Sequence, residues 1–135
     1  MLKKNAKILV VDDMKSMRLA IKKKLKVLEQ TNITEADDGG TAWNAIEESI
    51  GSGQPFDLIL SDWNMPNMTG IELLKKVRED ARTKHLTFVL VTAESEKEQV
   101  MEAIKLGVST YLTKPFTQES FNEKIEQISK KMQAA

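Results

Sequence analysis

The chain has 135 residues, and its 20 basic and 20 acidic side chains cancel to a formal net charge of zero. This length predicts one domain with its own hydrophobic core, and the charge balance gives no reason to expect a nucleic acid or an anionic membrane as a partner. The chain has no cysteine and one histidine, His85, which excludes a disulfide framework, a thiolate zinc site and most nucleophile–base pairs.

No targeting or membrane segment is visible in the sequence. The amino-terminal residues include lysines, but no apolar stretch of signal-peptide length follows them. No other segment approaches the length of a transmembrane helix. We therefore expect a cytoplasmic, monomeric protein that makes no membrane contact.

Short apolar runs and helical repeats alternate along the chain. Runs of apolar and β-branched residues predict buried strands, which cover 7–12, 56–62, 86–91 and 108–113, with a short polar edge strand at 32–36. Apolar residues spaced by three and four predict amphipathic helices, at 14–29 and in the stretches that follow residues 38, 69, 95 and 117. Five strands alternating with five helices predict a doubly wound α/β fold with a parallel sheet.

Each predicted helix has one apolar stripe that we expect to face the sheet. The inward residues are Met14, Met17, Ile21, Leu25, Leu28, Ala42, Ala45, Ile46, Ile50, Ile71, Leu74, Val77, Val100, Met101, Ile104, Phe121, Ile125, Ile128 and Met132. Capping boxes at 69–72 and 95–98 indicate two helix starts, Asp38 and Thr117 indicate two others, and Gly107 indicates a helix end.

Two features of these helices have a structural explanation. Trp43 falls near the stripe of the second helix and is predicted to pack against the core or at its rim, and not to form a platform for a cofactor. The first helix is locally basic, which a solvated helix face explains. Its basic residues are Lys15, Arg18, Lys22, Lys23, Lys24 and Lys26.

Polar side chains stand at the carboxyl ends of four predicted strands. Asp12 and Asp13 end the first strand, Asp62 the third, Thr92 the fourth and Lys114 the fifth. Because the carboxyl ends of parallel strands lie along one edge, where ligands bind, we expect these groups to converge. Three neighbouring carboxylates repel one another unless a cation neutralises them. Oxygen ligands without histidine or cysteine indicate a hard ion, Mg²⁺ first.

The same edge suits phosphoryl chemistry. Lys114 offers a compact positive charge, and the Thr92 hydroxyl can hydrogen-bond an added oxyanion. Asp62 is the best candidate nucleophile because it ends a central strand without an adjacent acid, whereas Asp12 and Asp13 are better placed to hold a metal. The structural alternatives are a turn cap at Asp62, or an ion-pair network that only holds the sheet edge together.

Four separated motifs carry a resemblance to a known family: Val10-Val11-Asp12-Asp13, Asp62 with Met65-Pro66 and Gly70, Val91-Thr92-Ala93, and Lys114-Pro115-Phe116. The pattern resembles the receiver domain of bacterial two-component response regulators across essentially the whole chain. The stretches 61–68, 91–94 and 114–117 are similar to the chemotaxis regulators of the CheY type. The resemblance implies a single receiver domain over 1–135 without an output domain, and a flavodoxin-like sheet with strand order 2-1-3-4-5 and helices on both faces.

The resemblance also implies how the acidic residues act. Asp62 would accept a phosphoryl group from a sensor histidine kinase. Asp13, Asp62 and the backbone carbonyl of Asn64 would bind Mg²⁺ directly, with Asp12 acting through water. The protein would catalyse only its own phosphorylation and dephosphorylation.

Further residues would contact the phosphoryl group or change conformation when it is added. Thr92, Lys114 and the backbone N–H of Ala93 would contact the phosphoryl group, and Lys114–Pro115 would be a cis peptide. Thr92 and Tyr111 would form the switch, in which Thr92 moves toward the phosphate and Tyr111 turns inward. Without the resemblance, Tyr111 would be interpreted as a half-buried aromatic residue.

The output face implied by the resemblance lies on the fourth helix, the fifth strand and the fifth helix. Its residues are Ser95, Lys97, Val100, Tyr111, Thr113, Phe116 and Lys124. In the chemotaxis interpretation this face contacts the flagellar motor switch protein, and a phosphatase is a further partner. The chain departs from the CheY type at Met14 and Lys15, in a longer loop at 51–55, and at Thr113 and 118–120.

Three other functions fit parts of the pattern. The first is a phosphorelay or phosphate-sink receiver without motor contact. The second is an Asp-dependent phosphohydrolase, which requires an acid two residues after the nucleophile, where this chain has Asn64. The third is an FMN carrier of the same fold, which requires a Ser/Thr-rich phosphate loop where this chain has Asp12, Asp13 and Met14.

Overall fold

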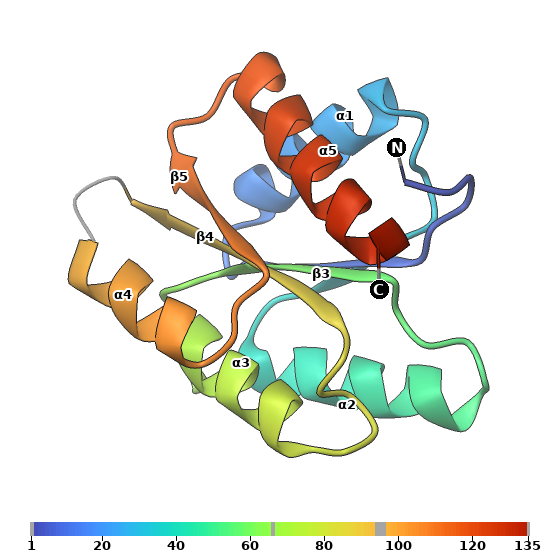
Figure 1. Ribbon diagram of the computed structural model, residues 1–135, viewed down its shortest axis with the longest axis vertical. Coiled ribbons are helices and arrows are strands. Elements are labelled where there is room, and N and C mark those ends of the chain that lie inside the picture. Colours follow the sequence, from blue (N-terminus) through green and yellow to red (C-terminus); the bar gives the residue numbers. More distant parts are fainter. Residues whose placement is uncertain (1, 66, 94–96, 135) are drawn as a thin grey trace.

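A computed structural model describes residues 2–65, 67–93 and 97–134 (Figure 1). Five parallel strands form one sheet in the order β2-β1-β3-β4-β5, which confirms the predicted architecture and strand order. The elements in chain order are β1 Ile8–Val11, α1 Lys15–Val27, β2 Ile33–Ala36, α2 Gly39–Gly51, β3 Leu58–Asp62, α3 Gly70–Glu79, β4 Thr87–Ala93, α4 Lys97–Lys105, β5 Thr110–Lys114 and α5 Gln118–Ala134.

The sheet lies between two layers of helices (Figure 1). Helices α1 and α5 cover one face, where Ile21 and Phe121 pack in a cluster with Val10 of β1. Helices α2, α3 and α4 cover the other face, where Ile46 and Leu74 belong to a second cluster. Because both faces are covered, every residue of β1 and β3 is buried. This explains why these two strands consist mainly of apolar residues.

Three residues predicted to face the core are exposed instead. Met14 is 57% exposed because it precedes α1 with an extended backbone and so is not part of the helical stripe. Met101 and Ile104 of α4 are 61% and 56% exposed, while Ala103 is fully buried. The inward stripe of α4 therefore passes through Ala103, and the nine-residue helix was too short for its apolar spacing to fix the buried face.

The described helix caps agree with the predictions. The Thr69 hydroxyl and the Glu72 carboxylate form the expected capping box of α3, and the Thr117 hydroxyl accepts a hydrogen bond from the backbone N–H of Ser120 at 3.0 Å. Gly107 has a φ of +90°, the left-handed conformation typical of a helix end. The box predicted at 95–98 begins outside the described residues.

Arg78 of α3 joins three segments near the amino-terminal ends of β4 and β5. Its guanidinium donates hydrogen bonds to the carbonyl oxygens of Gly107 at 2.7 Å, Leu86 at 2.7 Å and Lys84 at 3.0 Å. Gly107 follows α4, and Leu86 precedes β4. Arg78 therefore ties the carboxyl-terminal end of α4 to α3 and to the loop before β4.

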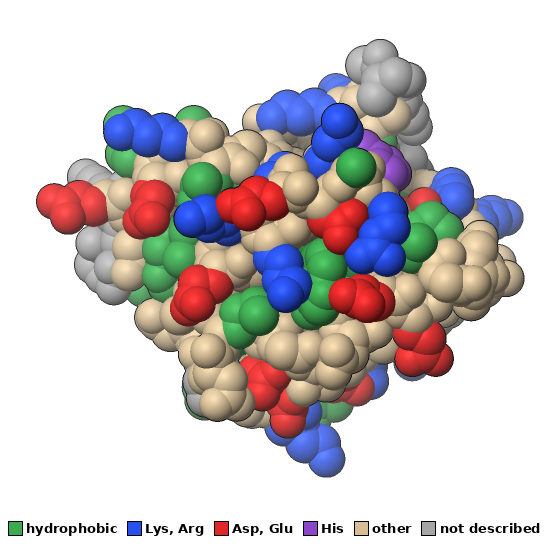
Figure 2. All heavy atoms as spheres, turned by 90° about the horizontal axis from the view of Figure 1, so that it is seen from below, with side chains coloured by type: hydrophobic (Ala, Val, Ile, Leu, Met, Phe, Trp, Pro, Cys, Tyr) green, Lys and Arg blue, Asp and Glu red, His purple; other side chains and the backbone are tan. Residues whose placement is uncertain are grey.

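The outer face of α2 and α3 mixes acidic, basic and apolar side chains (Figure 2). Trp43 is buried as predicted, with its indole N–H donating to Glu47 and the Lys76 ammonium 5.0 Å from a ring centre. Across the described ranges, no helix is both long and apolar enough to cross a bilayer.

The close approach of α3 to the end of β3 requires glycine at position 70. A Cβ atom there would lie 2.2 Å from the carbonyl oxygen of Asp62. We expect Gly70→Ala to lower the free energy of unfolding by about 1–3 kcal/mol, the usual cost of overpacking, measured by chemical denaturation. Gly51→Ala is the control, because a Cβ there meets nothing within 4 Å. Equal unfolding free energies in the two variants would contradict the prediction.

Candidate functional site

Four strands deliver the predicted polar residues to one edge of the sheet. Asp12 directly follows β1, and Asp62 is the last residue of the central strand β3. Thr92 and Ala93 end β4, where Ala93 pairs in register with Lys114, the last residue of β5. The parallel register therefore brings residues from distant parts of the chain to the same edge.

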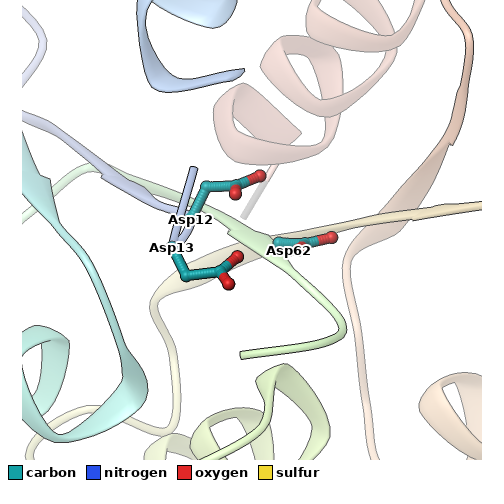
Figure 3. A group of neighbouring side chains, drawn as sticks. All are labelled: Asp12, Asp13 and Asp62. Carbon is teal, nitrogen blue, oxygen red and sulfur yellow. The ribbon is translucent and has the colours of Figure 1, made fainter. Parts of the chain in front are cut away.

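Three carboxylates meet at this edge. Asp12, Asp13 and Asp62 each provide one oxygen, and these oxygens all lie within 4.8 Å of one another. Figure 3 shows the three carboxylates turned to the same side, with Asp62 beside the acid pair. Asp12 and Asp62 are buried, whereas Asp13 is exposed. The cluster thus has a dry inner part and an outer part open to solvent.

Asp12 has one satisfied and one unsatisfied carboxylate oxygen. Oδ1 accepts a hydrogen bond from the Met14 N–H at 2.9 Å. Oδ2 is buried and has no hydrogen-bond partner in the described part of the chain. Burial raises the pKa of Asp12, and neighbouring Asp62 acts in the same direction, while the Met14 N–H and Lys114 oppose both. An orphaned acidic oxygen in this position is suited to a cation or to a water bound to one.

Lys114 is the cation that pairs with the cluster in the described residues. Its Nζ atom lies 3.0 Å from Oδ1 of Asp62 and 3.7 Å from Oδ2 of Asp12. The contact between Lys114 and Asp12 is an ion pair without a hydrogen bond, because its distance exceeds hydrogen-bonding range. One lysine facing three carboxylates leaves a deficit of positive charge. The oxygen-only donor set and this deficit are compatible with a divalent metal ion.

Thr92 offers a hydroxyl group without a hydrogen-bond partner. The residue is only 2% exposed, and its Oγ1 atom has no partner among the described residues. Most buried hydroxyl groups are hydrogen-bonded, so this one is available to a group added at the site. Ala93 beside it is exposed, as is Asn64 in the loop that follows β3.

Asp38 links the start of α2 to the loop after Asp62. One of its carboxylate oxygens accepts the Thr41 N–H at 2.8 Å, and the other accepts the Asn67 side-chain amide at 3.0 Å. These two hydrogen bonds lower the pKa of Asp38, and the Thr41 N–H has the larger effect. The sequence predicted Asp38 as a helix start but not the contact with Asn67, which lies 29 residues away in the chain.

Arg18 corrects part of the interpretation of the first helix. Its side chain is only 15% exposed and pairs with Glu35 of β2, and it also donates to the backbone carbonyl of Asp12 at 2.7 Å. Arg18 is therefore not one of the solvated basic residues. The sequence did contain one indication of this contact: Arg18 lies in the first turn of the helix that follows the acid pair, within reach of it.

The predicted output residues that the structure describes are half-buried: Val100, Tyr111, Thr113, Phe116 and Lys124. The Lys124 ammonium lies 4.9 Å from the centre of the Tyr111 ring, and the Phe116 ring lies 5.9 Å from that of Phe121. Ser95 and the side chain of Lys97 lie outside the described residues, as do Pro66 and Glu94.

Comparison with known families separates the receiver from the two alternatives of other classes. The model of the response regulator receiver domain matches residues 8–126. This chain belongs to the response regulator receiver family. The family match confirms the resemblance inferred from the sequence and favours a receiver over a phosphohydrolase or an FMN carrier. Lys114–Pro115 is a cis peptide, as the resemblance implied.

The relatives of this receiver domain include chemotaxis proteins. It is 51% identical over 122 residues to the chemotaxis protein CheY of Pseudomonas aeruginosa, covering 90% of this chain and 94% of that protein. It is 44% identical over 131 residues to the chemotaxis protein CheY-3 of Vibrio cholerae, covering 97% of each. The solved structure of the V. cholerae chemotaxis response regulator CheY4 superposes with a TM-score of 0.78 at 32% identity, covering 91% of this chain and 98% of that one.

The Asp38 carboxylate gives a pH-dependent prediction for the loop of the site. We expect Asp38→Ala to lower the free energy of unfolding at neutral pH by about 1 kcal/mol, the usual value of a helix cap. The pKa of Asp38 in the folded protein is lowered from the ordinary 3.8. Its contribution is therefore complete above that value and is lost as the pH falls through the lowered folded-state pKa.

Chemical denaturation across the acidic range measures this difference between the wild type and the alanine variant. Asp38→Asn is the control for the cap, because its single amide oxygen can still accept the hydrogen bond from the Thr41 N–H without titrating. A wild-type–alanine difference that stays constant on acidification would show that the carboxylate charge makes no contribution.

Proposed function

We propose that this receiver domain accepts a phosphoryl group on Asp62 from a sensor histidine kinase, with Mg²⁺ bound, and signals in chemotaxis. The supporting observation is the combination at one sheet edge of three carboxylates, the Lys114 ammonium and the unpartnered Thr92 hydroxyl. The relatives named chemotaxis proteins support the pathway.

Asp62 is the phosphoacceptor in this proposal. It ends the central strand, and Lys114 holds its Oδ1 at 3.0 Å, which fixes the orientation of the carboxylate. One Asp62 oxygen forms a bond to phosphorus while the nitrogen–phosphorus bond of the donor breaks. The electron pair of that bond stays on the donor's imidazole nitrogen. Lys114, the Thr92 hydroxyl and the Ala93 N–H stabilise the negative charge on the phosphoryl oxygens.

The carboxylate cluster is the proposed metal site. Asp13, Asp62 and the carbonyl of Asn64 would hold Mg²⁺ directly, and the free Oδ2 of Asp12 suits a metal-bound water. When bound, the ion supplies positive charge that offsets the carboxylates and the phosphoryl oxygens. Lys114 pairs with Asp12 and Asp62 and offsets part of their negative charge.

Phosphorylation changes the charge next to the switch residues. A phosphoryl group adds up to about two negative charges, and the Thr92 hydroxyl is the group available to turn toward them. Tyr111, half-buried two strand positions before Thr113, then moves inward and alters the α4–β5–α5 face. Exposed Met101 and Ile104 on α4 add apolar area near this face.

The flagellar motor switch protein is the proposed target, and a phosphatase is a further proposed partner. The predicted contacts come from the output residues Ser95, Lys97, Val100, Tyr111, Thr113, Phe116 and Lys124.

Trp63 gives a direct test of metal binding and phosphorylation. It is buried directly after Asp62, so we expect its fluorescence to change on addition of Mg²⁺ and again on addition of a small acyl phosphate. In Asp62→Asn the second change should vanish, whereas the first should persist at a higher Mg²⁺ concentration, because a neutral amide oxygen replaces one of the proposed carboxylate ligands. Trp63→Phe is the control for the Trp43 signal. A metal response without a donor response in the wild type would disprove phosphoryl transfer.

Substitution of Thr92 is expected to change the rate of phosphorylation without lowering the free energy of unfolding. Because its Oγ1 makes no hydrogen bond in the described structure, we expect Thr92→Val to leave the free energy of unfolding unchanged or to raise it by about 1 kcal/mol. The rate of phosphorylation by an acyl phosphate should fall by roughly 100-fold, as when an oxyanion donor is removed. Thr92→Ser is the control that retains the hydroxyl, and an unchanged rate in the valine variant would exclude this role.

A further inference from the structure

Arg18 contacts the backbone of the acid pair through one arm of its guanidinium group. It lies in the first turns of α1, and its Nη1 donates to the carbonyl oxygen of Asp12 at 2.7 Å. Its Nε donates to the Glu35 carboxylate at 3.0 Å. The Arg18 side chain is 15% exposed, and its hydrogen bond to the Asp12 carbonyl is partly buried, so that this bond is stronger than it would be in water.

The carbonyl of Asp12 belongs to the peptide group that joins Asp12 to Asp13. Because a peptide group is planar, fixing its oxygen also fixes the direction in which the chain enters Asp13. The Asp12 N–H donates to the Ala36 carbonyl at 3.1 Å, and Asp12 Oδ1 accepts from the Met14 N–H at 2.9 Å. Arg18 thus completes a set of hydrogen bonds that orients both acids toward Asp62.

Glu35 holds Arg18 in this orientation. It lies on the edge strand β2 in register with Val10 of β1, two residues before Asp12. One Glu35 oxygen accepts from Arg18, and the other pairs with Lys22 at 3.1 Å. An exposed ion pair of this kind adds little stability by itself. Its effect is to fix the direction of the guanidinium group.

We propose that Arg18 is a positioning residue for the metal site, and that Glu35 holds Arg18 in place. This inference rests on the proposed function, since the metal is the one that phosphorylation of Asp62 would use. Arginine suits this role because its planar guanidinium group donates in two fixed directions at once. The single ammonium group of a lysine has the same charge but lacks that geometry.

The test compares the Mg²⁺ dissociation constant in the wild type, Arg18→Lys and Glu35→Gln, measured by calorimetry and Trp63 fluorescence. We expect Arg18→Lys to weaken Mg²⁺ binding about tenfold, the lower end of the usual effect of an outer-shell partner, and Glu35→Gln to weaken it by less. Arg82→Lys is the matched control, because Arg82 pairs with Asp80 at 2.8 Å outside this site. At saturating Mg²⁺ the phosphorylation rate of Arg18→Lys should return to near the wild-type value.

Two outcomes would overturn the inference. One is an Arg18→Lys variant with wild-type Mg²⁺ affinity and a lower free energy of unfolding, which would make Arg18 a structural tie only. The other is additivity of Arg18→Lys and Glu35→Gln in the double variant, since residues that act as a unit give non-additive effects. If Arg18→Lys does not fold, Mg²⁺ affinity in Glu35→Gln decides the question.

The same experiment separates this inference from the proposed function. A wild-type protein that binds no Mg²⁺ would contradict the proposed function itself. Wild-type Mg²⁺ binding and phosphorylation, together with unchanged affinity in both variants, would contradict the role of Arg18 alone.

Discussion

The mutual repulsion of Asp12, Asp13 and Asp62 is the constraint on which the functional edge depends. Their oxygens lie within 4.8 Å of one another, and because Asp12 and Asp62 are buried, water screens the repulsion between the negative charges only weakly. Lys114 offsets this only in part, through contacts to two of the three. The surrounding fold therefore has to hold the three carboxylates in place against this repulsion.

That support comes from the rigid centre and from the rim of the sheet. The strands β1 and β3 are buried throughout and fix the backbone positions of Asp12 and Asp62. Side-chain hydrogen bonds hold the loops. Arg18, paired with Glu35, holds the β1–α1 turn, and Asp38 holds the β3–α3 loop through Asn67. A site built from strand ends thus receives its final orientation from side chains on helices and on the edge strand.

The sequence was sufficient to predict the sheet, because burial on both faces leaves uninterrupted apolar runs in β1 and β3. It also predicted the acidic edge, because acids placed directly after parallel strands share one edge of the sheet. The sequence was insufficient to predict side-chain contacts between residues that lie far apart in the chain. Arg18 reaches Glu35 across 17 residues, and Asp38 reaches Asn67 across 29. The short α4 gave the wrong stripe at Met101 and Ile104. The strand-end position alone indicated Asp12 and Asp13 as metal-binding residues. Family resemblance was needed for Asp62 and the Asn64 carbonyl as direct ligands and for the switch residues.

The hydrogen bonds of Arg78 have a consequence for how the output face moves. They fasten the carbonyl of Gly107, just beyond α4, to α3 and to the residues before β4. The rearrangement proposed to start at Thr92, at the other end of β4, would therefore act on a helix with one anchored end. If the proposed switch displaces α4, these hydrogen bonds would hold its carboxyl-terminal end in place, so that the helix would rotate about Gly107. Displacement would then be smallest near Lys105 and would increase toward Lys97.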